Sequence, residues 1–172
     1  MKLVTFTHKN SEPKLGIFNN DTVLDLEAFA HKHNEEFPKT MLELIDLGLE
    51  EVNRIAEILK TSSESAIAAA SLPLNEIKLL APITKPRKNI IGIGLNYTEH
   101  VAESARTLDT SKDLPQQPVI FSKPPTAVIG TDEAILHNTK LTQQLDWEVE
   151  LAVIISKKGK YIAKENAMDY VF

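Results

Sequence analysis

The feature that most constrains this chain is the run Leu-Asp-Trp-Glu-Val-Glu-Leu-Ala-Val-Ile-Ile at residues 145–155. β-Branched and aromatic residues dominate it and neither proline nor glycine interrupts it, which predicts a β-strand. Successive side chains of a strand point to opposite faces. One face is therefore entirely apolar, whereas the other carries two glutamates and becomes apolar toward its end.

The two glutamates of the mixed face are Glu148 and Glu150. On a strand their Cα atoms would lie roughly 6.6 Å apart, at a rise of about 3.3 Å per residue. Like charges held this close repel unless a cation lies between them, and a hard divalent ion takes oxygen ligands. The spacing alone also fits the solvated face of a half-buried strand. Ala152 and Ile154 continue the same face and favour the floor of a cleft with a charged mouth.

Composition excludes several classes of function. The chain has 172 residues, which suits one domain or one and a half. It contains no cysteine, which excludes disulfides, thiolate-bound zinc and a cysteine nucleophile, and permits a reducing compartment. Its formal net charge is −5 and it has no basic stripe, so a nucleic-acid partner is not expected.

The chain shows no signal for a membrane. Its first residues lack the long apolar core of a signal peptide, and no apolar run approaches the length of a membrane span. We therefore expect no membrane partner and a cytoplasmic location.

The first part of the chain, residues 1–74, is explained by packing alone. Alternating patterns predict strands at 2–7, 14–18 and 22–26, and apolar residues at helical spacing predict helices after Asp25, at 41–48 and at 49–60. Asp25 is the expected N-cap and Gly48 the expected helix end. A proline-rich stretch follows, and we expect the domain boundary near residue 75.

The second part, residues 75–172, carries the candidate chemistry. Residues 90–94 predict a buried strand whose glycines allow close approach, and Tyr97 stands where a dinucleotide fingerprint needs glycine. A short helix then places His100 and Glu103 one turn apart, and a carboxylate beside an imidazole prepares it as a base. An unused surface pair is the alternative. Lys123 ends the strand at 119–123 and is either a contact for an anionic ligand or a solvated lysine.

Four separated motifs resemble the fumarylacetoacetate hydrolase family, in its smaller bacterial and mitochondrial-type branch. They are Gly-Leu-Asn-Tyr-x-x-His-x-x-Glu at 94–103, Phe-Ser-Lys-Pro-Pro at 121–125, the run at 145–155, and Ala-Met-Asp-Tyr-Val-Phe at 167–172. The resemblance implies an α+β fold that is mainly β, with a small N-terminal α/β domain followed by part of a mixed β-roll. It also implies a homodimer.

The resemblance implies roles for the candidate residues. The metal pair of the family, which holds Mg²⁺, Mn²⁺ or Ca²⁺, falls on Glu148 and Glu150. Its catalytic dyad falls on His100 and Glu103, and its substrate lysine on Lys123. The family's third metal carboxylate lies downstream of the last motif, so the chain is expected to be a truncated, incomplete domain.

These roles predict a divalent-metal-dependent hydrolase that cleaves carbon–carbon bonds in small 2-oxo or β-diketo acids, of the acylpyruvate or fumarylacetoacetate kind. The ion would stabilise an enolate and His100, oriented by Glu103, would activate water. An isomerase, a hydratase or an oxaloacetate-type decarboxylase would use the same groups. A non-catalytic metal or small-molecule binding module and a purely structural oligomerisation domain are the alternatives from other classes.

Overall fold

The computed structural model describes residues 1–9, 11–107 and 115–172, with the side chains of all of these except 103–107. The chain divides into two compact units. One comprises residues 1–84 together with 129–172, and the other residues 85–128. The domain boundary expected near residue 75 stays a prediction.

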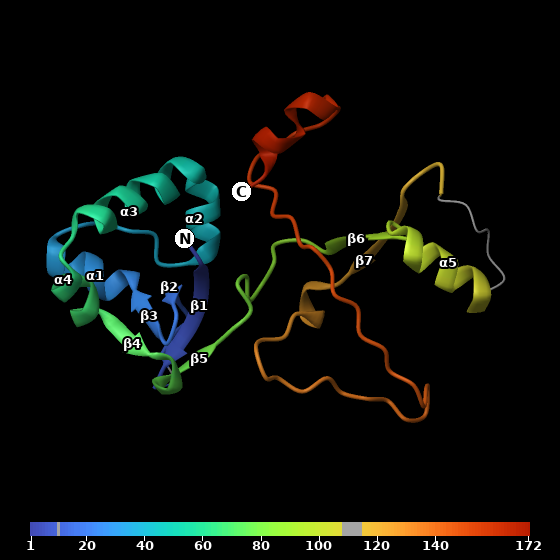
Figure 1. The fold of residues 1–172 in the computed structure, drawn as a ribbon, viewed down its shortest axis with the longest axis horizontal. Coiled ribbons are helices and arrows are strands. Elements are labelled where there is room, and N and C mark those ends of the chain that lie inside the picture. Colours follow the sequence, from blue (N-terminus) through green and yellow to red (C-terminus); the bar gives the residue numbers. More distant parts are fainter. Residues whose placement is uncertain (10, 108–114) are drawn as a thin grey trace. The chain divides into compact units, whose positions relative to one another are not determined.

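A five-stranded antiparallel sheet forms the centre of residues 1–84 (Figure 1). Its strands are β1 (Leu3–His8), β2 (Lys14–Asn19), β3 (Thr22–Asp25), β4 (Ser71–Pro73) and β5 (Ile77–Leu79). The order across the sheet is β4-β3-β2-β1-β5. The first three strands form the predicted meander, in which Leu3 lies opposite Ile17 and Ile17 opposite Leu24. Short turns fix this register because each strand pairs with its neighbour in sequence.

Four helices pack with this sheet: α1 (Leu26–His33), α2 (Met41–Leu47), α3 (Leu49–Thr61) and α4 (Glu64–Ala69). Asp25 caps α1 as predicted, because its carboxylate accepts a hydrogen bond of 2.9 Å from the Ala28 N–H. Thr40 and Glu43 form a reciprocal capping box on α2. Gly48 adopts a positive φ of 78° between α2 and α3, which explains why a glycine stands there.

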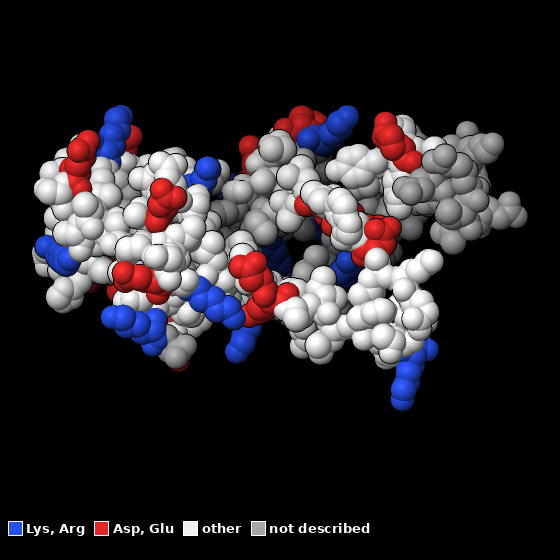
Figure 2. All heavy atoms as spheres, turned by 60° about the horizontal axis from the view of Figure 1, so that its bottom comes forward, with Lys and Arg blue, Asp and Glu red and all other residues white. Residues whose placement is uncertain are grey.

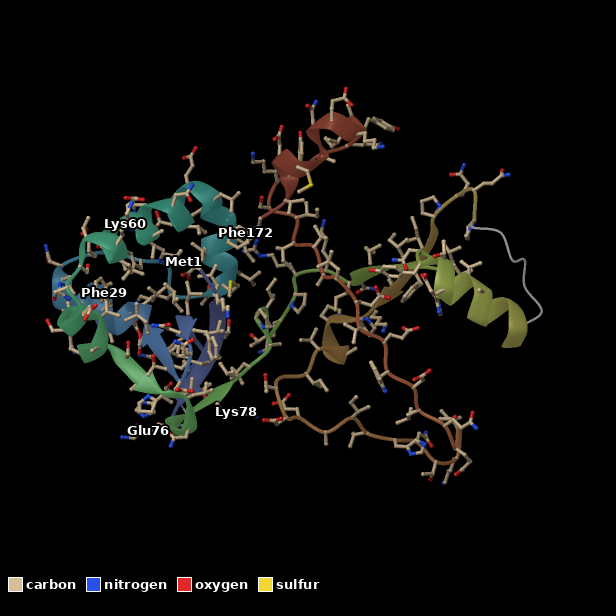
Figure 3. The ribbon with its side chains drawn as sticks, viewed as in Figure 1. Met1, Phe29, Lys60, Glu76, Lys78 and Phe172 are labelled. Carbon is tan, nitrogen blue, oxygen red and sulfur yellow. The ribbon has the colours of Figure 1, made fainter. Side chains whose placement is uncertain are left out.

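The core lies between the helices and the sheet. Phe29 of α1, labelled in Figure 3, belongs to this core and is fully buried. Leu15 from β2, Leu44 from α2 and Ile55 from α3 contact the same cluster and are fully buried. The apolar periodicity of residues 1–74 therefore identified a real core.

The unit of residues 85–128 is built on a two-stranded antiparallel ribbon of β6 (Ile90–Gly94) and β7 (Val119–Lys123). Gly92 lies opposite Phe121, and a Cβ atom built on Gly92 would come within 2.4–2.8 Å of the Phe121 ring. Close approach of this ring explains the glycine, whereas the prediction that the strand is buried is wrong, because Ile90, Ile91 and Ile93 are exposed. Helix α5 (Thr98–Thr107) follows β6, and a 3-10 turn at Pro125–Ala127 follows β7.

Residues 129–172 contain little regular structure. A 3-10 helix spans Lys164–Tyr170, and Ile155 forms an isolated antiparallel bridge with Val171. The β-strand predicted at 145–155 is wrong in this structure: up to residue 154 the run has no regular secondary structure. Among the described residues, only its last part finds a backbone partner, through the Phe172 N–H to the Ile154 carbonyl at 2.9 Å. A strand is stabilised by a neighbouring strand, and local propensity does not replace it.

Among the helices of the described residues, none combines the length and apolar character needed to cross a membrane.

Candidate functional site

The two candidate metal ligands are exposed. Glu148 and Glu150 lie in the irregular run of the first unit, and both side chains face solvent. The described part of the chain holds no group of three or more histidine, aspartate or glutamate side chains placed to share an ion. The predicted strand is absent from residues 145–155, and the two exposed glutamates do not lie on the floor of a cleft in this conformation.

The donor chemistry of this pair still suits a hard cation. Carboxylate oxygens are the ligands that Mg²⁺ and Ca²⁺ take, and such ions need six or more oxygens in all. Glu148 and Glu150 would supply some of these, and water or further groups would supply the others. The pair fits part of a metal site and does not form a complete one.

His100 lies in the first turns of α5. Its side chain is half-buried, and the neighbouring Val101 is buried, with 2% of its surface exposed, so the helix is anchored beside the histidine. Glu103 follows one turn later on the same helix, as predicted, but its side chain lies outside the described residues. The spacing of the His100–Glu103 pair is thus present, and the contact between the two side chains stays a prediction.

The turn that leads into α5 contains a strained residue that the sequence did not reveal. Leu95 has a φ of 53°, in the left-handed region where a bulky residue is uncommon. It follows β6 directly and lies within the motif at 94–103. Strain of this kind concentrates at functional sites. A leucine gives no sequence signal for such a conformation, so the sequence does not predict this turn.

The first turn of α5 also perturbs Glu99. Hydrogen bonds from its own backbone N–H and from the Thr98 hydroxyl hold the pKa of this carboxyl below its ordinary value. The side chain is exposed. Glu99 therefore stays ionised at the start of the helix, where a negative charge is favourable.

Lys123 lies at the end of β7, opposite Ile90, and is exposed. Its Nζ atom is 5.9 Å from the centroid of the Phe121 ring, a weak cation–π contact. This position fits either predicted role, a contact for an anionic ligand or a solvated lysine.

His100 and Lys123 belong to the unit of residues 85–128, whereas Glu148 and Glu150 belong to the other unit. The assignment of these four side chains to one site stays a prediction. On the face shown in Figure 2, acidic and basic side chains are interspersed, which agrees with the lack of a basic stripe in the sequence.

Known proteins place these features in a family. Residues 89–172 match the family model described as fumarylacetoacetate (FAA) hydrolase C-terminal. Oxaloacetate tautomerase YisK of Bacillus subtilis is 36% identical over 161 residues, which cover 91% of this chain and 52% of that protein. A mitochondrial oxaloacetate tautomerase of Homo sapiens is 36% identical over 177 residues, covering 99% of this chain and 50% of that protein.

The fold agrees with a solved structure as well. A fumarylacetoacetate hydrolase from psychrophilic Exiguobacterium antarcticum superimposes with a TM-score of 0.66 and 27% identity, covering 100% of this chain and 53% of that one. The chain therefore belongs to the fumarylacetoacetate hydrolase family, and the predicted α+β fold class is confirmed. It spans about half the length of the curated relatives that it matches.

Proposed function

We propose that this chain provides the proton-transfer and substrate-binding groups of a keto–enol tautomerase that acts on a small 2-oxo acid of the oxaloacetate type. The supporting observation is that relatives with 36% identity over almost the whole chain are named oxaloacetate tautomerases. This favours the isomerase alternative over the carbon–carbon hydrolase that the motifs first suggested.

The reaction moves one proton and breaks no carbon–carbon bond. In the keto-to-enol direction the carbon next to the ketone loses a proton, and the ketone oxygen gains one. His100 is the proposed base that takes the proton from carbon and returns it to oxygen, with Glu103 as its positioning residue. Lys123 would pair with a carboxylate of the substrate.

A divalent cation is part of the proposal. Mg²⁺, or Mn²⁺ or Ca²⁺ in its place, would be held by Glu148 and Glu150 with further oxygen donors, and when bound it would polarise the ketone as a Lewis acid. The homodimer and the cytoplasmic location stay predictions, and light scattering would measure the first.

The proposal is tested by following the ultraviolet absorbance of enol oxaloacetate. The assay uses the 172-residue chain and a chimera in which these residues replace the matching half of YisK. We expect the chimera to accelerate tautomerisation, and His100→Ala to lower the rate about 10²- to 10⁴-fold, as for loss of a general base. His31→Ala, an exposed histidine on α1, is the matched control and should leave the rate unchanged.

Two results would count against the proposal. Cleavage of an acylpyruvate by the chimera without tautomerase activity would restore the hydrolase. Oxaloacetate binding with no turnover, in a chimera that is otherwise folded, would favour the non-catalytic binding module.

A further inference from the structure

A groove opens on the surface of residues 1–84, between the segment that leads into α2 and the first turns of α3. It has a volume of about 530 Å³, and we name it the α2–α3 groove. Among the described residues, its lining comes from residues 36–38, 43, 46, 47, 51 and 54. The groove is therefore built by one local stretch of the chain, in the region that has its own buried core.

One part of this lining is apolar and is anchored to the core. Phe37 stacks on the fully buried Phe29, with 6.2 Å between the ring centroids. Leu47, at the end of α2, is 58% exposed. Among the described residues of 1–84, it is one of three large apolar side chains that are exposed. Leu47 thus offers an apolar contact in a region that otherwise buries such side chains.

The other part of the lining is acidic. Four carboxylates contribute to it together with one guanidinium, and they belong to Glu36, Glu43, Asp46, Glu51 and Arg54. The lining therefore carries an excess of negative charge. A surface that combines apolar contact with negative charge is complementary to a partner that combines apolar contact with positive charge.

The positive charge of Arg54 is already used within the protein. Its guanidinium donates hydrogen bonds to Glu51 at 2.7 and 2.9 Å, to Glu35 at 3.3 Å and to the Glu36 carbonyl at 2.6 Å, and it lies 5.2 Å from the centroid of the Phe37 ring. These contacts join α3 to the segment before α2. They hold this side of the groove in place before any partner binds, which lowers the cost of ordering it.

The start of α2 holds the other side in place. Glu43 accepts hydrogen bonds from the Lys39 N–H at 2.7 Å and the Thr40 N–H at 3.2 Å, as part of the capping box. The side chains of Glu36 and Asp46 are exposed. We therefore expect these two carboxylates to meet the cations of a partner.

We propose that the α2–α3 groove is a docking site for a basic segment of another protein, in which an apolar side chain lies between lysines or arginines. The apolar side chain would contact Phe37 and Leu47, and the flanking cations would pair with Glu36 and Asp46. This binding site goes beyond the proposed tautomerase activity and does not rest on it.

The probe is a fluorescein-labelled helical peptide in which leucines form one face and lysines flank them. Two control peptides carry glutamates in place of the lysines or serines in place of the leucines. Fluorescence anisotropy measures binding to the 172-residue chain. We expect the leucine–lysine peptide to bind more weakly as salt rises, and both controls to bind at least tenfold more weakly than it does. Equal binding of the three peptides, or no binding of the first, would overturn the proposal.

A pair of leucine substitutions tests the apolar contact. Leu47→Ser should weaken binding of the leucine–lysine peptide about tenfold, because it removes an apolar surface that the peptide covers. Leu49→Ser is the matched control, since Leu49 is 52% exposed and lies outside the groove lining. Equal affinities of the two variants would contradict docking in the groove.

A pair of double substitutions tests the charges. Glu36→Gln with Asp46→Asn should weaken binding about two- to tenfold, as for loss of two exposed ion pairs. Glu12→Gln with Asp21→Asn is the control, because it removes the same charge from exposed residues outside the groove. An equal loss in the control would assign binding to the net charge of the chain and count against the proposal.

The YisK chimera tests whether the groove is open in a longer chain. We expect the leucine–lysine peptide to bind the chimera as it binds the 172-residue chain. Loss of binding in the chimera would show that the added half covers the groove. Self-association that Leu47→Ser abolishes, without peptide binding, would identify a second copy as the occupant. Either result would refute docking of a basic segment. All substituted residues are exposed, so circular dichroism should show unchanged folding of every variant.

Discussion

Residues 1–84 and residues 129–172 belong to the same unit, yet large apolar side chains are buried in the first region and mostly exposed in the second. In the first region Phe6, Phe29 and Ile55 are fully buried. In the second, Leu136 is 93% exposed and Leu151 82% exposed. Both regions are rich in apolar residues. The difference teaches that apolar content alone does not predict burial, which also depends on the packing partners that a segment finds.

The contrast follows the backbone pairing of the two regions. In the first region β1, β2 and β3 pair with one another, β1 and β3 also pair with the later strands β5 and β4, and α1 begins where β3 ends. Among the described residues, the run at 145–155 pairs its backbone with the backbone of residues 171–172 alone, through the bridge between Ile155 and Val171 and the bond from the Phe172 N–H to the Ile154 carbonyl, and Ile154 also packs against the core.

The largest expected effect comes from the core of the first region. Phe29→Ala removes a ring that is fully buried and stacks 4.4 Å, between centroids, from His33. A cavity of this kind should lower the free energy of unfolding by about 3–5 kcal/mol. Urea denaturation followed by circular dichroism measures the change.

The matched experiment is Leu151→Ala in the second region. Leu151 is equally apolar but 82% exposed, so we expect a change within about 0.5 kcal/mol. A loss comparable to that of Phe29→Ala would show that residues 145–155 are packed in solution, and the contrast between the two regions would fail.

The same contrast determines how much the sequence could predict. The meander, the N-cap at Asp25 and the helix end at Gly48 follow from local chemistry, and the structure confirms them. The strand at 145–155 was predicted from equally strong propensity and is absent, because propensity does not provide hydrogen-bond partners. His100, Lys123 and the glutamate pair could be proposed from motifs, but their convergence depends on contacts between distant segments.

A smaller effect is expected at Asp25, which joins β3 to α1. Its carboxylate caps α1 and also accepts a hydrogen bond of 3.0 Å from Lys14. The residue is 5% exposed. Asp25→Ala should lower the free energy of unfolding by about 1–2 kcal/mol, as for loss of an N-cap. Asp25→Asn keeps a capping oxygen and should recover part of the loss; an equally unstable Asn variant would assign the effect to the ion pair with Lys14.

The next effect is on the pH dependence of stability, through the carboxyl of Glu27, which pairs with the same lysine as Asp25. A hydrogen bond from Lys14 lowers the pKa of this carboxyl, against the raising effect of burial, and attraction to Lys14 and Lys39 adds to the lowering. A depressed pKa stabilises the fold above the ordinary glutamate value, and that stability is lost as pH falls through the folded pKa.

Glu27→Gln should therefore reduce the loss of stability between about pH 5 and pH 3. Because 44% of the side chain is exposed, we expect a difference below about 1 kcal/mol. Urea denaturation at several pH values measures it, with Glu12→Gln in the turn before β2 as the control. Identical pH profiles for the Glu27 variant and the unaltered chain would remove the ion pair from the explanation.

The smallest effect is expected from Mg²⁺ on the 172-residue chain, and it tests the second region directly. Glu148 and Glu150 are exposed on a run without regular structure, so an ion would have to order the backbone as well as bind. Binding should be in the millimolar range, weak for an oxygen site. At a concentration equal to the dissociation constant, such binding stabilises by about 0.4 kcal/mol. Calorimetric titration measures the affinity, and the double substitution Glu148→Gln with Glu150→Gln should abolish it. Micromolar affinity would mean that residues 145–155 already hold the two carboxylates together, as a preformed strand would.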